Sequence, residues 1–106
     1  MAEWLAREKK MAETIDELTV NYEEEGKVLR KEEAKEVLSK GSWTTIMFLY
    51  RDLDRKTGEY GPAKISIRRY QKREGSYLQR SKFEISSAIQ AWAICRKIKD
   101  WFPAED

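Results

Sequence analysis

Histidine is absent from this chain of 106 residues, and cysteine occurs once, as Cys95. A single cysteine excludes a disulfide framework within the chain. Without an imidazole or a cysteine pair, we expect no zinc site, and neither Ser-His-Asp nor Cys-His catalysis is available. Cys95 is interpreted as a small core residue rather than a redox centre.

Glycine is also sparse, and its five copies are scattered at positions 26, 41, 58, 61 and 75. This spacing contains no glycine-rich phosphate loop of the Walker or Rossmann type. The neighbouring acids Asp52 and Asp54, and the run from Glu23 to Glu25, lie on charged turns, where carboxylates usually face solvent. The sequence therefore predicts a protein that is not an enzyme and that binds neither a metal nor a cofactor.

No apolar run reaches the length of a membrane span, and the first ten residues lack the apolar centre of a signal peptide. Hydrophobic residues still make up 41% of the chain, with 4 Trp, 5 Tyr and 3 Phe, which is too much for a disordered protein. We expect one folded cytoplasmic domain with a modest core and no membrane contact.

The net charge of +2 is small but unevenly distributed. Residues 1–40 carry 8 basic and 11 acidic side chains, whereas residues 61–100 carry 10 basic and 3 acidic ones. A local cationic excess attracts phosphate backbones, although it also occurs on lysine-rich surfaces that are merely solvated. Charge alone favours the solvated surface, and only the aromatic residues nearby make a polyanion partner for the later part of the chain the better interpretation.

The segments 64–72 and 77–85 indicate a β-hairpin closed by a turn that contains Gly75. Alternate side chains of a strand point to opposite faces, so Ile65 and Ile67 share an apolar face. Pairing the two strands collects five cations and a tyrosine on the other face: Lys64, Arg68, Tyr70, Lys72, Arg80 and Lys82. Cations that hold a backbone, beside rings that stack on bases, are typical of single-strand binding. The other interpretation is a basic edge that only keeps the sheet soluble.

Two further strands are expected before this hairpin. Residues 43–50 are apolar without alternation, which is typical of a central strand covered on both faces. Residues 27–40 contain good helix formers, yet a turn at 39–42 leads directly into that strand. Helix and strand both remain open for 27–40, and we favour a strand over 36–40.

A helix is expected near each end of the chain. Residues 2–18 repeat apolar side chains at helical spacing. Residues 87–102 form a second amphipathic pattern, which begins at a capping residue, Ser87. Its main apolar stripe is assigned to the sheet, whereas Ile89 and Trp92 lie beside the stripe. These two residues favour a two-fold contact between helices in a homodimer.

Together the elements predict an α+β fold in the order β-β-β-β-α. We expect a four-stranded antiparallel sheet followed by a C-terminal helix, with a helical N-terminal extension. The extension would occupy residues 1–35, the domain residues 36–102 and a short tail residues 103–106.

The domain resembles the positive cofactor four type of transcriptional coactivator, a family that includes small bacterial proteins that bind single-stranded DNA. The resemblance rests on Lys64-Ile-Ser-Ile-Arg-Arg-Tyr70, on the Gly75 turn, on the strand that ends Lys82-Phe-Glu-Ile-Ser86, and on the final helix. It implies a strongly curved sheet backed by the helix, a dimer formed largely by helices, and concave grooves for unpaired DNA. It also implies that Arg68 takes the motif's arginine position and Tyr70 its aromatic position.

These observations predict a homodimer that binds single-stranded DNA, or RNA, with little sequence preference, in transcription regulation. The five cations of the hairpin face would contact phosphates, and Tyr70 would stack on a base. The alternative is a structural or protein-interaction module without nucleic-acid binding. In that case the N-terminal helix covers the sheet, and Ile89 and Trp92 dock a partner.

Overall fold

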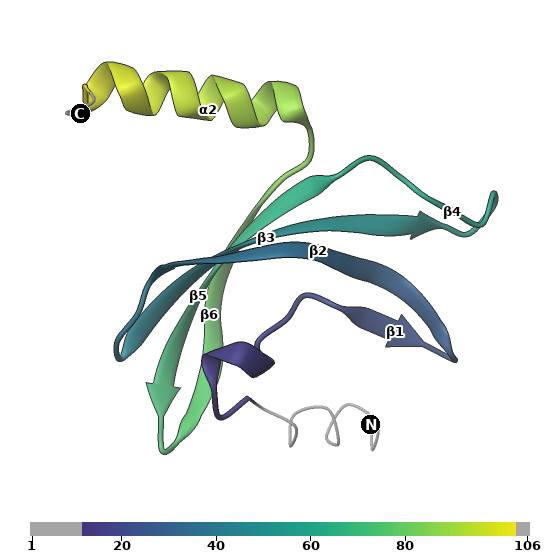
Figure 1. Cartoon of the computed structure of the whole chain (residues 1–106), viewed down its shortest axis with the longest axis horizontal. Coiled ribbons are helices and arrows are strands. Elements are labelled where there is room, and N and C mark those ends of the chain that lie inside the picture. Colours follow the sequence, from purple (N-terminus) through teal and green to yellow (C-terminus); the bar gives the residue numbers. More distant parts are fainter. Residues whose placement is uncertain (1–11, 104–106) are drawn as a thin grey trace.

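The computed structural model of the protein describes residues 12–103. Its main feature is a curled antiparallel sheet of six strands, ordered β1-β2-β3-β5-β6, with the short β4 paired to β3. The sheet curves like half of a barrel, and a helix follows the last strand (Figure 1). The elements are η1 (Ile15–Glu17), β1 (Tyr22–Glu24), β2 (Lys27–Ser39), β3 (Trp43–Asp54), β4 (Glu59–Tyr60), β5 (Lys64–Arg73), β6 (Ser76–Ile85) and α2 (Ala88–Trp101).

The predicted fold, with four strands and a helical N-terminal extension, is wrong, because the sheet has six strands. The helix expected over 2–18 lies partly outside the described residues. Between residues 12 and 20, helical geometry is confined to the 3-10 turn Ile15–Glu17. A short helix is only marginally stable in water. An extended segment that buries its apolar side chains on the sheet is therefore favoured over the helix.

In strand β2, backbone pairing with neighbouring strands outweighs the helix propensity of the residues. Lys27–Ser39 contains the helix formers that left this segment open, yet it pairs with β1 on one edge and with β3 on the other. Differences in helix propensity among ordinary residues are at most about 0.7 kcal/mol. Backbone pairing on both edges outweighs them, so the strand begins at Lys27 rather than at residue 36.

Two hairpins close with the same dipeptide. Glu25-Gly26 joins β1 to β2 and Glu74-Gly75 joins β5 to β6, each as a two-residue loop. The φ angles of these residues are 50°, 82°, 52° and 84° in chain order. Positive φ at both central positions is typical of the type I′ turn, whose twist matches that of paired strands. These turns fix the register of both hairpins.

One face of the sheet, the concave face, carries the core. Buried and less buried residues alternate along β3, and the buried ones are Thr44, Ile46, Phe48 and Tyr50. The residues between them include Trp43 and Leu49, which are 40% and 37% exposed. Only one face of this strand is therefore fully covered by the described residues, whereas the sequence led us to expect cover on both.

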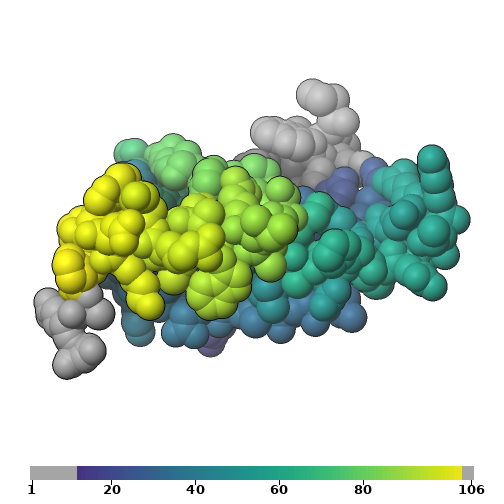
Figure 2. Space-filling model, turned by 90° about the horizontal axis from the view of Figure 1, so that it is seen from above, coloured from purple at the N-terminus to yellow at the C-terminus, as the bar shows by residue number. Residues whose placement is uncertain are grey.

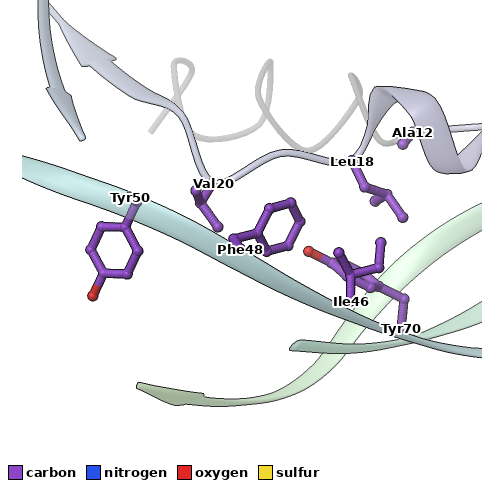
Figure 3. Packing of buried hydrophobic residues seen from close by; sticks show 7 residues of the cluster. All are labelled: Ala12, Leu18, Val20, Ile46, Phe48, Tyr50 and Tyr70. Atoms are coloured by element: carbon purple, nitrogen blue, oxygen red, sulfur yellow. The ribbon is translucent and has the colours of Figure 1, made fainter. Parts of the chain in front are cut away.

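The cover is supplied by residues 12–21, a segment that we call the strap. It runs along the concave face ahead of β1 (Figure 1). Its side chains Ala12, Leu18 and Val20 are buried in one cluster with Ile46, Phe48, Tyr50 and Tyr70 of the sheet. Leu18 and Val20 lie near Ile46 and Phe48 (Figure 3). The strap thus completes the hydrophobic core.

The helix α2 lies on the other side of the sheet from the strap (Figure 1), and from above its yellow and light-green atoms lie in front of the left and central part of the molecule (Figure 2). It begins as predicted, because the Ser87 hydroxyl accepts a hydrogen bond from the Gln90 amide at 3.1 Å. None of its residues is buried. The expected apolar stripe is half-buried only at Ala91, Ile94 and Cys95.

Candidate nucleic-acid interface

The ribbon formed by β5 and β6 contains an irregularity that changes the predicted cationic face. Arg69 pairs with Ser81, but the next residue, Tyr70, pairs with Gln79, so Arg80 is an extra residue in β6. Such a β-bulge reverses the alternation beyond it. Gln79 therefore lies on the concave face, where its Oε1 accepts a hydrogen bond from Arg68 Nη1 at 3.0 Å.

Arg80 lies on the opposite, convex face of the ribbon. Its Nε donates to Gln71 Oε1 at 3.0 Å, and Gln71 alternates with Tyr70 along β5. The prediction that Arg80 shares a face with Arg68 is wrong, because a strict two-residue period does not allow for the inserted residue.

Tyr70 is placed in the core rather than in an open groove. It is 4% exposed and lies under the strap (Figure 3). The Arg68 side chain next to it is 12% exposed. Burial raises the pKa of Tyr70. A ring in this position is unavailable for stacking on a base while the strap is in place.

Three of the predicted cations, Lys64, Arg68 and Lys82, belong to a network around two carboxylates. Asp52 bonds Arg30 Nε at 2.9 Å and Lys64 Nζ at 3.3 Å. Glu84 receives Arg30 Nη1 at 3.1 Å and Arg68 Nη2 at 3.4 Å. Further donors to Glu84 are the hydroxyls of Ser66 at 3.1 Å and Tyr50 at 3.2 Å, and Lys82 lies 4.0 Å away. These contacts join β2, β3, β5 and β6.

The network also sets the protonation of its acids. At Asp52, partial burial acts to raise the pKa, but the hydrogen bond and charge of Arg30, with Lys64, outweigh it and lower the pKa. At Glu84, burial is likewise outweighed, by the charge of Arg30 and the hydrogen bond from Ser66, so its pKa is also lowered. Both acids stay ionised near neutral pH and pair with Lys64, Arg68 and Lys82, three of the five cations that the sequence assigned to phosphates.

Exposed cations without an ion pair gather instead at the end of the ribbon. Arg69 lies over the Trp43 ring, with its Cζ 4.5 Å from the ring centroid, and Lys72 Nζ lies 5.3 Å from that of Tyr77. Among residues 12–103, neither these two cations nor Arg73 and Arg80 form an ion pair with a carboxylate. We call the exposed group the ribbon tip: Trp43, Arg69, Lys72, Arg73 and Arg80.

Of the cations of the ribbon tip, sequence reasoning assigned only Lys72 and Arg80 to a binding site. The missed signal lies in the odd positions of β5, where the apolar pair Ile65 and Ile67 gives way to Arg69. Where the residues on one face of a strand change from apolar to cationic, the covered part of that face ends.

The two residues proposed for a dimer contact are exposed. Ile89 is 82% and Trp92 62% exposed on α2. Three further large side chains of the same end of the chain are also exposed, namely Ile98, Trp101 and Phe102. An apolar surface of this kind on a helix usually marks an interaction site.

No family model matches the chain, and no curated protein and no solved structure is significantly similar to it. The resemblance to the coactivator family therefore stays a prediction. Over residues 12–103, no helix is long and apolar enough to cross a bilayer. That same stretch holds no cluster of three metal-ligating side chains.

Proposed function

We propose that the protein is a homodimeric, cytoplasmic binding protein for single-stranded nucleic acid, that it is not an enzyme, and that the ribbon tip is its contact surface. The observation that carries the proposal is the exposed Trp43 ring beneath Arg69, with Lys72, Arg73 and Arg80 nearby and unpaired. Single strands are held by cations along the backbone and by rings that stack on bases. The ribbon tip offers both kinds of group, whereas Lys64, Arg68 and Lys82 are already paired with carboxylates.

The proposal moves the contact surface away from Tyr70 and Arg68. Segment 64–85 carries seven basic and two acidic side chains, so the whole ribbon keeps a positive potential even with its concave cations paired. The potential would attract a strand, and the exposed Trp43 ring would hold it.

A titration of a fluorescein-labelled oligo-dT, followed by anisotropy at two salt concentrations, tests the proposal. We expect affinity to fall with salt, since single strands give a slope of about −0.7 per phosphate contact in a plot of log K against log salt. Arg69→Ala/Arg80→Ala should weaken binding and reduce the slope by about 1.4, one contact for each guanidinium.

A charge-matched control is Lys27→Ala/Lys56→Ala. These two lysines are exposed and lie at the β1–β2 and β3–β4 turns, at the other end of the sheet from the ribbon tip (Figure 1). The control should bind like the wild type. Equal losses in both double variants would mean that net charge, and not this surface, governs binding, and the site assignment would fail.

The dimer part of the proposal rests on α2. Its large exposed side chains can be covered by the same helix of a second copy, and two-fold dimers are the commonest oligomers. Light scattering during size exclusion should give the mass of two 12.6 kDa chains. Ile89→Ser/Trp92→Ser should give monomers, whereas Lys99→Ser on the same helix should not. A wild-type monomer at high concentration would remove the dimer from the proposal.

The alternative, an interaction module that binds no nucleic acid, is favoured by the covered concave face. It predicts that the protein dimerises through α2 while oligonucleotides fail to bind even at low salt. The oligo-dT titration and the light-scattering measurement, made on the same sample, separate the two functions.

A further inference from the structure

The strap lies on the concave face in the manner of a bound peptide. It belongs to none of the six strands, and its regular structure is limited to the turn Ile15–Glu17. Its side chains alternate between anchors and solvent: Leu18 and Val20 are 7% and 3% exposed, whereas Thr19 between them is exposed. This is the pattern of an extended segment that inserts every second side chain into a groove.

The groove has an apolar floor with a defined set of contacts. Leu18, Val20 and Ala12 join one buried cluster with Ile46, Phe48, Tyr50 and Tyr70, and the half-buried Ile15, Val37 and Tyr77 pack against it. The acidic side chains Glu13, Asp16 and Glu17 all remain exposed. Recognition therefore depends on the apolar anchors and not on ion pairs of the strap.

Polar contacts of the groove are made mostly to the strap backbone. Lys35 Nζ donates to the carbonyls of Ile15 at 2.7 Å, Asp16 at 3.2 Å and Leu18 at 2.6 Å. An ammonium group at the end of a helical turn satisfies carbonyls that have no partner within the turn. The Tyr77 amide also donates to the Ala12 carbonyl at 2.9 Å. Backbone contacts of this kind accept any sequence that has the right shape.

The groove is wider than the strap alone requires. A hollow of about 490 Å³ lies beside Val20 and Asn21, and it is lined on the sheet side by Arg30, Asp52 and Arg68. The network at this end of the groove holds four cations, Arg30, Lys64, Arg68 and Lys82, against two carboxylates, Asp52 and Glu84, so a positive excess remains. An acidic side chain placed just after the second anchor would fit there.

We propose that the concave groove is a recognition site for an extended acidic peptide of a partner protein, and that the strap is a tethered competitor for it. The partner segment has one helical turn followed by an aliphatic residue, any residue and a second aliphatic residue, as in Leu18-Thr-Val20. Lys35 holds the turn, and the apolar floor holds the two aliphatic side chains. This site is separate from the ribbon tip, so either proposal can fail without the other.

Fluorescence anisotropy of a labelled peptide of residues 12–22 tests the proposal on the full chain. Leu18→Ser/Val20→Ser in the protein should free the groove and let the peptide bind. A tethered competitor has an effective concentration of the order of millimolar, so the wild type should bind the peptide at least about tenfold more weakly. A peptide that carries the same two serines is the matched control and should not bind.

Three results would overturn the proposal. The first is a folded double variant that binds neither peptide, and the second is equal binding of both peptides. The third is a double variant that does not bind the peptide but binds oligo-dT more tightly than the wild type does. If the Arg69→Ala/Arg80→Ala changes do not remove this extra binding, the groove is a nucleic-acid site.

Hydrogen exchange in the wild type keeps the proposal testable if the double variant does not fold. Two amides of the sheet donate hydrogen bonds to the strap. The Tyr77 amide donates to the Ala12 carbonyl at 2.9 Å, and the Glu32 amide donates to Asn21 Oδ1 at 2.7 Å. A competitor that opens locally predicts that both exchange faster than the amides shared by β3 and β5. Exchange of both only through global unfolding would make the strap a permanent part of the core, and the groove would not be a recognition site.

Discussion

The two faces of the sheet, built from the same strands, differ in how the chain covers them. On the concave face, Ile46 and Phe48 are 0% exposed under the strap, and Arg30, Lys64 and Arg68 are paired with Asp52 and Glu84. On the convex side, Trp43 and Phe83 are 40% and 53% exposed, and α2 has no buried residue. Stability therefore comes from the concave face, while the convex side and α2 are available for partners.

The largest expected effect tests this division with two phenylalanines. Phe48→Ala empties a fully buried site and should cost about 3–5 kcal/mol of unfolding free energy. Phe83→Ala, on the convex side, should cost less than about 1 kcal/mol, because its side chain is half exposed. Urea unfolding at one protein concentration measures both. Similar losses would mean that the convex side is covered in solution.

A smaller effect is expected at the carboxylate that joins the most strands. Glu84→Ala leaves Arg30 and Arg68 without their shared partner and should cost about 1–3 kcal/mol. Glu59→Ala removes an exposed carboxylate of β4 and should be nearly neutral. Thermal unfolding of the two variants gives the comparison, and equal shifts would contradict a structural role for the network.

The same network predicts a pH dependence. Because the pKa values of Asp52 and Glu84 are lowered in the folded state, their contribution is present above the unfolded values of about 4. It is lost as the pH falls below about 4 towards the folded values. Asp52→Asn/Glu84→Gln should flatten the stability curve between pH 5 and pH 2, measured by urea unfolding. An unchanged slope in this variant would exclude these two acids as its source.

The smallest expected effect lies in α2. Ser87→Ala removes the hydroxyl that caps the helix, a contact usually worth about 1 kcal/mol. Since α2 buries no residue, the loss should appear as faster hydrogen exchange in its first turn, with little change in global unfolding. An equal loss in global stability would indicate that α2 is docked, on the sheet or on a second copy.

Local patterns predicted the elements whose determinants are local. The ribbon follows from its alternation and its glycine turn, and α2 follows from its apolar stripe and the Ser87 cap. The segment 27–39 was ambiguous because its residues favour a helix while its environment is a sheet. Strands β1 and β4 are three and two residues long and carry little periodicity of their own.

The candidate site was harder to predict, because three non-local features determine it. The bulge moves Arg80 to the convex face, the strap covers Tyr70, and Asp52 pairs with Lys64 from a neighbouring strand. None of these is visible in the period of a single strand. Alternation therefore predicts which way a side chain of a strand points. Whether that side chain is exposed depends on the segments that pack on the sheet.

The two Glu-Gly turns have a consequence for the order of folding. Each closes a hairpin between residues that are near neighbours in the sequence, which costs little chain entropy, so we expect both hairpins to form early. The strap must wait, because the amide that binds Ala12 belongs to Tyr77, a residue of the last strand. A ribosome releases Leu18 and Val20 long before their binding surface exists. During synthesis these two side chains stay open to chaperones until Tyr77 has emerged, so the strap is among the last segments of the sheet domain to be buried.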